Sequence, residues 1–254
     1  INALRILNAS QQFNLDKLIE LGYDTYLAAF EVLIPSLLKA WENKKDDENY
    51  SGLKDAIEIL RNWDLRCSET SVATTLAIEW GENLIPKMNT AERDVIKRMT
   101  DYVMGAKDTE LLGELKKVLN KLQSNFGTWY VAWGEVNRYQ RISGEPGAKY
   151  EDSKASLPVA FAASTWGCLP SYVSRYYDGT KKRYGYNGNT FICAVEFGKK
   201  LKAKSLLTGG VSGDPNSPHF TDQAELYSKG KFKDVLFYKE DILKNAVRKY
   251  KPGQ

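Results

Sequence analysis

The sequence predicts an α+β protein in which a helical first half, residues 1–127, precedes a strand-rich second half, residues 128–254, with a terminal helix. Apolar residues recur at helical spacing in the first half, whereas short β-branched and aromatic runs bounded by Gly, Ser or Asn characterise the second. The charge balance also changes, from −4 in the first half to +8 in the second. Because no flexible linker or internal repeat separates the halves, we expect two parts of one packed body.

The composition is typical of a globular protein, with 43% hydrophobic and 27% charged residues in a chain of 254. A chain of this length can bury a substantial core. It contains no run of about 18 apolar residues, which argues against a membrane span. The opening INALRIL resembles the middle of a helix, so we expect that Ile1 is not the natural beginning of the protein.

The first helices are predicted from capping and spacing. Asn14 can accept a hydrogen bond from an unpaired backbone N–H and is expected to cap a helix that starts at Leu15. This helix should continue toward Trp41, with Pro35 bending or interrupting it. A polar loop is expected at 46–52, where the sequence is DDENYSG.

More helices are predicted after that loop. One carries Ile57, Leu60 and Trp63, a second covers 72–84, and Thr90 is expected to cap a third. The clearest stripe stops at Gly127 and consists of Leu111, Leu112, Leu115, Val118, Leu119, Leu122 and Phe126. A single apolar face is the usual way in which a helix packs, so we interpret all these stripes as core.

Strands are expected in the second half at 157–164 (LPVAFAAS) and 190–198 (TFICAVEFG), which are rich in β-branched and aromatic residues. LKAKSLLTGG at 201–210 alternates polar and apolar residues, and FKDVLFY at 232–238 is another expected strand. A helix at about 240–250 closes the chain before Pro and Gly stop it.

The cysteines Cys67, Cys168 and Cys193 are far apart and form no CxxC pair, which argues against zinc binding or redox catalysis. Two states stay open for them. One pair can form a disulfide if the protein is exported, whereas an odd number of cysteines in apolar surroundings favours buried thiols.

The most unusual stretch is GGVSGDPNSPHFTDQ at 209–223, which holds the single histidine of the chain. It lacks the Lys-Ser/Thr of a Walker loop and the helix that must follow a dinucleotide-binding loop, so phosphate binding is not favoured. Ser212 or Ser217 with His219 and Asp222 supplies the residue types of a hydrolytic triad. A triad is defined by geometry, however, and these residues all lie in one short loop.

The same loop is a poor metal site, because one His with Asp214 and Asp222 needs further ligands from elsewhere. We therefore expect no metal and no cofactor on this chain. A lone His in a loop rich in Gly and Pro is more often a hydrogen-bonded anchor than a catalytic group.

A nucleic-acid-binding surface is the alternative offered by SYVSRYYDGTKKRYGYNGN at 171–189. Cations there could contact phosphates while tyrosines stack on bases. The residues concerned are Lys181, Lys182, Arg183, Tyr172, Tyr176, Tyr177, Tyr184 and Tyr186. The other interpretation is a long loop with packed tyrosines and hydrated lysines, and the modest net charge and missing motif favour it.

The closing segment, GGVSGDPNSPHFTDQAELYSKGKFKDVLFYKEDI, resembles the C-terminal end of the β chain in the penicillin acylase family. That family has a Gly-x-Ser-Gly turn, a short insert and a His-aromatic-x-Asp-Gln helix start. The corresponding residues here are Gly210, Ser212, Gly213, His219, Phe220, Asp222 and Gln223. LRNWDLRCSETSVATTLAIEW, WYVAWGEVNRYQRI and GNTFICAVEFG resemble three further family segments in the same order.

The resemblance implies an N-terminal nucleophile hydrolase with an αββα sandwich. Such enzymes cleave amides with a serine that becomes residue 1 of the β chain, where its own α-amine takes the proton. Backbone and Asn donors then hold the oxyanion. Ile1 has no nucleophilic atom, so the nucleophilic Ser and the oxyanion Asn are expected upstream of it. Arg5 lies near the place of an active-site arginine but is not given that role.

By this resemblance the chain is the C-terminal portion of the β chain, inactive by itself, and any calcium ligands lie outside it. Its partners would be the α chain and the N-terminal part of the β chain, in a periplasmic or exported protein. The substrate would be an N-acyl amide, such as a β-lactam side chain or an N-acyl homoserine lactone. A nucleic-acid-binding module and a non-catalytic acylase-like scaffold are the alternatives.

Within this interpretation the loop 209–223 is a structural turn. Its glycines would let the chain reverse sharply. Asp222 or Thr221 would cap the following helix, and His219 would anchor the turn by hydrogen bonding.

Overall fold

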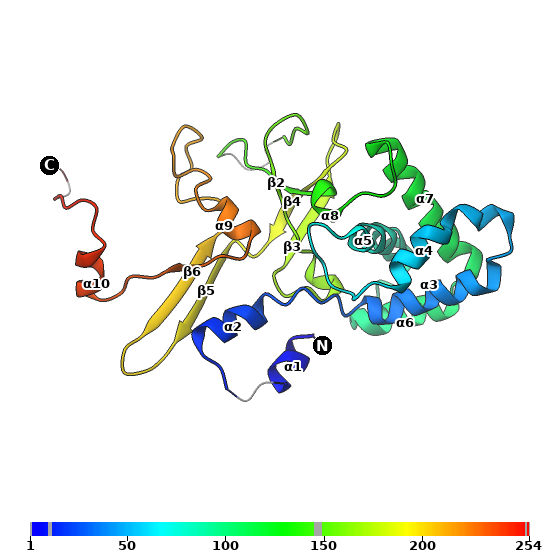
Figure 1. Cartoon of the computed structure of the whole chain (residues 1–254), viewed down its shortest axis with the longest axis horizontal. Coiled ribbons are helices and arrows are strands. Elements are labelled where there is room, and N and C mark those ends of the chain that lie inside the picture. Colours follow the sequence, from blue (N-terminus) through cyan, green and yellow to red (C-terminus); the bar gives the residue numbers. More distant parts are fainter. Residues whose placement is uncertain (1, 10–11, 145–148, 252, 254) are drawn as a thin grey trace.

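The structure is a computed structural model that describes residues 2–9, 12–144, 149–251 and 253. It is an α+β protein, as the sequence predicts, with the helices between residues 30 and 126 gathered at one end and the strands in the middle and toward the other end (Figure 1). Ile1 lies outside the described residues. The αββα sandwich implied by the resemblance stays a prediction.

The first helices differ from the prediction of one helix from Leu15 toward Trp41. After α1 (Asn2–Asn8), α2 (Leu15–Gly22) ends early, and α3 (Phe30–Lys44) keeps Pro35 inside it. The Asn14 cap is confirmed, because its side chain accepts from the Lys17 N–H. The segment 23–29 between α2 and α3 is not helical, because it hydrogen-bonds to distant backbone segments instead of to itself.

The remaining helices of the first half are η1 (Glu48–Leu53), α4 (Lys54–Arg61), α5 (Val72–Leu84), η2 (Ile85–Lys87), α6 (Val95–Gly105) and α7 (Asp108–Phe126). The range of α5 and the end of α7 agree with the sequence, and Gly127 takes the left-handed conformation at φ 77°. The loop predicted at 46–52 is wrong for most of its length, because η1 begins at Glu48 and ends at Leu53. The cap of α6 is Asp94, whose side chain accepts from Lys97 N, and not Thr90.

The larger sheet has the strand order β2-β1-β4-β3. Its strands are β1 (Asn137–Tyr139), β2 (Leu157–Pro158), β3 (Tyr172–Tyr176) and β4 (Arg183–Gly188), and α8 (Trp133–Val136) leads into β1. Only β1 and β4 pair in parallel. The prediction of a strand at 157–164 is mostly wrong, because only Leu157 and Pro158 pair with another strand and η3 (Ser164–Trp166) follows.

The smaller sheet has the order β5-β6-β7, formed by β5 (Phe191–Glu196), β6 (Lys202–Leu207) and β7 (Lys233–Asp234). The strands predicted at 190–198 and 201–210 are therefore present, whereas that at 232–238 shrinks to two residues. Between β6 and β7 lies α9 (Ala224–Ser228). The terminal helix α10 (Lys239–Lys244) is shorter than the predicted 240–250, because no buried face supports it.

One buried apolar cluster includes residues from both halves of the sequence. Trp80 of α5, Trp133 of α8 and Trp166 of η3 are among its largest members, and each is at most 1% exposed. Phe30 stacks on Trp166 with ring centroids 5.1 Å apart, so a helix of the first half packs on a segment of the second. The halves share a core.

Candidate functional site

The loop 209–223 is closed at its base by two backbone hydrogen bonds. Ser212 N donates to His219 O at 3.1 Å, and Gln223 N donates to Gly209 O at 2.8 Å. Gly210 lies between these bonds, and a Cβ atom there would collide with the His219 carbonyl and lie 2.7 Å from Asp222 Oδ1. A glycine is therefore required where the two arms of the loop meet.

The Ser, His and Asp side chains of this loop are not arranged as a catalytic triad. His219 Nδ1 and Asp222 Oδ2 are 2.8 Å apart, but their side chains are 63% and 37% exposed. Ser217 Oγ accepts from the backbone N–H of His219, and Ser212 Oγ accepts from that of Asp214. The serine oxygens thus serve local turns, and the exposed His–Asp pair lacks the enclosed surroundings that strengthen charge stabilisation.

The predicted helix cap is wrong in detail. Gln223 is the residue before α9, and no side chain accepts a hydrogen bond at this cap. The Asp222 carboxylate pairs with His219 instead, while Thr221 contributes only its backbone oxygen, which accepts from Ala224 N at 3.0 Å. Gln223 itself is 6% exposed, so the end of the family motif lies in the protein interior.

Arg141 holds the loop against the larger sheet, a role that no pattern in the sequence indicates. Its Nη1 donates to Phe220 O, and its guanidinium lies 4.0 Å from the centroid of the Phe220 ring. In the Trp-Gly-x-x-x-Arg segment, Arg138 donates to the carbonyl oxygens of Gly134 and Ser156 at 2.7 and 2.6 Å. Both arginines serve packing between segments.

The segment 171–189 is a β hairpin, β3 and β4, and not a loop. Arg183 is 5% exposed and lies 2.8 Å from Glu79 of α5, so it cannot contact a phosphate. Tyr172 and Tyr184 are 5% and 0% exposed, so they cannot stack on bases. The nucleic-acid hypothesis is wrong for these three residues.

Glu79 and Arg183 form a buried ion pair that joins α5 to β4. Burial alone would raise the pKa of Glu79, but the attraction of Arg183 and Lys121 outweighs it and holds this pKa below its usual value. Lys121 Nζ lies 2.8 Å from the second carboxylate oxygen. Glu79 is therefore ionised at neutral pH and supports the contact between the halves, not proton transfer.

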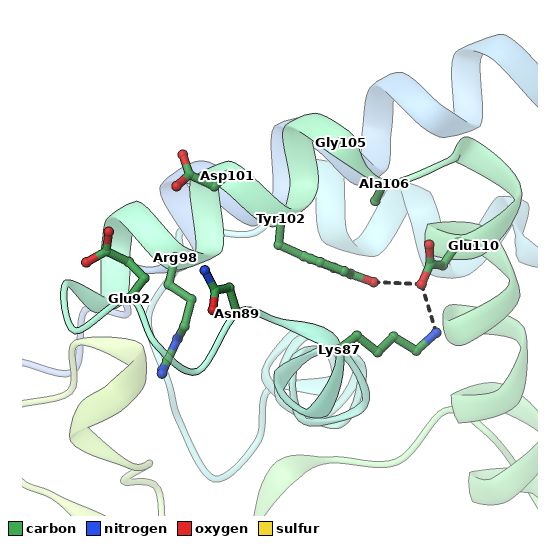
Figure 2. A pocket seen from close by; sticks show the side chains of 9 residues that line it. All are labelled: Lys87, Asn89, Glu92, Arg98, Asp101, Tyr102, Gly105, Ala106 and Glu110. Atoms are coloured by element: carbon green, nitrogen blue, oxygen red, sulfur yellow. Dashed lines mark hydrogen bonds and ion pairs between the residues drawn. The ribbon is translucent and has the colours of Figure 1, made fainter.

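A cavity of about 360 Å³ lies between η2, α6 and the start of α7 (Figure 2). Lys87 Nζ and the Tyr102 hydroxyl both donate to Glu110 Oε1, at 3.0 and 2.9 Å. Burial, with this hydrogen bond, raises the pKa of Tyr102 to about 12. Lys87 also pairs with Glu114. These charges are satisfied by one another, so neither Lys87 nor Tyr102 is an activated nucleophile.

No group of three His, Cys, Asp or Glu side chains in the described part of the chain could hold a metal ion. Cys67 and Cys168 are buried and Cys193 is exposed. Among residues 2–9, 12–144, 149–251 and 253, no helix is both long enough and apolar enough to cross a membrane. Arg5 pairs with Glu31 at 2.9 Å on the surface.

Comparison with known proteins gives two findings. The family model described as penicillin amidase matches residues 2–244. A solved structure of a thermostable penicillin G acylase from Alcaligenes faecalis aligns with 98% of this chain at 14% identity and a TM-score of 0.49. The chain spans about half of that protein's chain, because the alignment covers 51% of it.

Proposed function

Because the chain belongs to the penicillin amidase family, we propose that it is part of an enzyme that hydrolyses the amide bond of an N-acyl compound. The family match carries this proposal, since it extends over residues 2–244 and so includes both halves of the chain. The substrate class we propose is a β-lactam side chain, an N-acyl homoserine lactone or a related small amide.

The nucleophile is proposed to lie outside these 254 residues, as a serine with an oxyanion-binding Asn. The hydroxyl oxygens of Ser212 and Ser217 accept local backbone hydrogen bonds. The thiols of Cys67 and Cys168 are 2% and 1% exposed, too deep for a substrate to reach. A nucleophile needs an adjacent base and access to the carbonyl carbon, and none of these four groups has both.

The role proposed for this chain is to support the rest of the acylase, namely the α chain and the N-terminal part of the β chain. The order β5-β6-β7 makes β5 an edge strand, whose free backbone groups favour pairing with a further strand. Phe191, the first residue of β5, and Phe197, which follows its last residue, are 61% and 83% exposed. Exposed apolar side chains next to an open strand edge are typical of a surface that a partner covers.

The C-terminal arm, residues 233–251, extends this surface. Its first two residues are β7 of the smaller sheet, and beyond them it projects from the body at the end opposite to α3–α7 (Figure 1). Its exposed apolar side chains are Val235, Leu236, Phe237, Ile242, Leu243, Val247 and Tyr250. We propose that these side chains too pack on the remainder of the protein. We also propose that the protein is periplasmic and that any calcium ion is held by residues outside this chain.

Hydrolysis is tested with a panel of N-acyl 4-nitroanilides of different acyl groups, using the intact protein and the purified 254-residue chain. The intact protein should release nitroaniline from at least one member. The isolated chain, with its folding checked by circular dichroism, should release none. Turnover by the isolated chain, with contaminants excluded by mass spectrometry, would contradict the placement of the nucleophile.

The same panel distinguishes the alternatives. A folded intact protein that cleaves no member of the panel, and no β-lactam or acyl homoserine lactone, would favour the non-catalytic scaffold. Oligonucleotide binding that weakens steeply with salt would favour the nucleic-acid module, with Lys181 and Tyr186 as its exposed residues.

A further inference from the structure

Two cysteines that are distant in the sequence meet in the core. The Sγ atoms of Cys67 and Cys168 are 3.6 Å apart, although 101 positions separate the residues. Both are free thiols, and both side chains belong to the buried apolar cluster. The third cysteine, Cys193, is exposed on β5. Two sulfur atoms at this distance are in direct contact with nothing between them.

Backbone hydrogen bonds to the segment 23–29 bring the two cysteines together. On one side, Cys67 N donates to Thr25 O at 3.0 Å. On the other side, Ala29 N donates to Trp166 O at 3.0 Å. The two cysteine-bearing segments therefore hydrogen-bond to the same piece of chain.

Gly167, next to Cys168, allows this close approach. It takes φ 104°, and a Cβ atom there would lie 2.6 Å from the backbone nitrogen of Ala28. Any other residue would force the segment that carries Cys168 away from residues 23–29. The contact between the two thiols therefore depends on the close approach of Gly167 to Ala28.

We propose that Cys67 and Cys168 form an intrachain disulfide when the protein folds in an oxidising environment. Sulfur atoms in a disulfide are about 2 Å apart, so side-chain rotation and a small shift of either segment must close roughly 1.5 Å. Cys193 is excluded from this bond by its place on the outside of the smaller sheet.

The bond forms by thiol–disulfide exchange with a small disulfide such as oxidised glutathione. The thiolate of one cysteine attacks the reagent, which gives a mixed disulfide and releases one glutathione thiol. The second thiolate then attacks the protein sulfur of that mixed disulfide and releases the second glutathione thiol. Overall two protein thiols are oxidised and one disulfide is reduced to two thiols.

Exchange must happen before the core closes. The hydrogen bond to Cys168, together with burial, raises the pKa of the Cys67 thiol well above its usual value. Since the thiolate is the reactive form, the folded reduced protein should react slowly. Unfolded or partly folded chains should react quickly, so the bond should depend on oxidant being present during refolding.

The test uses the intact protein, denatured, reduced and refolded with a mixture of reduced and oxidised glutathione. Trypsin cuts the chain so that each cysteine falls in its own peptide, 67–87, 155–175 or 184–199. After alkylation without reduction, mass spectrometry should show peptides 67–87 and 155–175 linked and 184–199 alkylated. Adding the oxidant only after folding should give much less of the linked peptide over the same time.

Three variants complete the test. Cys193→Ser should still give the linked peptide, whereas Cys67→Ser and Cys168→Ser should each abolish it. The oxidised wild-type protein should melt roughly 5–15 °C above the reduced protein, because a bond across about 100 residues restricts the unfolded chain. Cys67→Ser should show no such difference between oxidising and reducing conditions.

Three free thiols after oxidative refolding of a protein with native circular dichroism would overturn the proposal. So would a linked peptide that contains Cys193. Disulfide formation needs no amidase activity, and amide hydrolysis needs no disulfide. The two proposals can therefore fail independently, since one is read by peptide mass and the other by released nitroaniline.

Discussion

The helices of residues 30–126 and the C-terminal arm of residues 233–251 are both rich in apolar side chains, but they bury them very differently. Leu33 and Leu37 of α3 are 0% exposed, whereas Phe237 and Leu243 of the arm are 64% and 58% exposed. In Figure 1 the helices pack on one another, while α10 lies apart from them. A run of apolar residues therefore predicts a core only where another surface covers it, and among the described residues none covers most of the arm's apolar side chains.

The largest expected effect comes from the charge pair that fastens the helices to β4. Glu79→Gln should lower the free energy of unfolding by about 3–5 kcal/mol, because it leaves the buried Arg183 without its full counter-charge. Glu82→Gln is the matched control, since Glu82 is 38% exposed and its contact with Arg183 is longer, 3.3 Å. Urea denaturation should show a loss under about 1 kcal/mol for the control.

The same pair predicts a pH dependence. The pKa of Glu79 is lower in the folded protein than its ordinary value of 4.5. Its stabilising contribution is therefore fully present above that value and is lost as the pH falls through the folded pKa. The difference between wild type and Glu79→Gln should narrow below about pH 4.5 and stay constant from pH 6 to 8. A difference that grows on acidification would contradict this assignment.

A leucine pair tests the comparison of helices and arm directly. Leu33→Ala in α3 should cost about 2–5 kcal/mol, because it removes a fully buried side chain and leaves a cavity. Leu243→Ala in α10 should change the stability of the isolated chain by at most about 0.5 kcal/mol. If the proposed remainder of the protein covers the arm, Leu243→Ala should weaken the assembly of the chain with that remainder in a pull-down. Equal losses of stability in the isolated chain would break the comparison.

Sequence reasoning succeeded where local signals decide the structure. The stripe ending at Gly127 and the Asn14 cap need only residues within a few positions of each other, and both are confirmed. It failed at 23–29, where the backbone bonds to segments far along the chain. It also missed β3 and β4, because the charge of Arg183 suggested solvent and its partner Glu79 lies 104 positions away.

For the candidate site, the sequence identifies the family motif but does not predict the contacts that its residues make. The order of Gly, Ser, His, Asp and Gln identifies the segment, and similarity to the family model over residues 2–244 supports the family. The sequence does not show that Asp222 pairs with His219 and does not cap α9, because this choice depends on side-chain rotation inside the loop. The contact of Arg141 with Phe220 joins positions 79 residues apart, and no sequence pattern predicts it.

Two glycines of the loop allow a smaller, closely matched test. Gly210→Ala should cost about 1–3 kcal/mol, because the new Cβ meets the His219 carbonyl at the base of the loop. Gly213→Ala should be nearly neutral, since a Cβ there meets no described atom within 4 Å. Thermal melting of the two variants under the same conditions measures the difference. Equal melting temperatures would show that the loop does not close as described.

The smallest expected effect is that of His219→Ala. The exposed pair with Asp222 should contribute roughly 0.2–1 kcal/mol, so the variant should melt slightly below the wild type. If the intact protein hydrolyses amides as proposed, its kcat should be unchanged, because neither Ser212 nor Ser217 is placed to use the imidazole as a base. His219→Gln is the matched control, since an amide can replace the hydrogen bond but not the proton transfer. Normal melting of both variants with abolished turnover would mean that this loop, and not only the proposed distant serine, takes part in the chemistry.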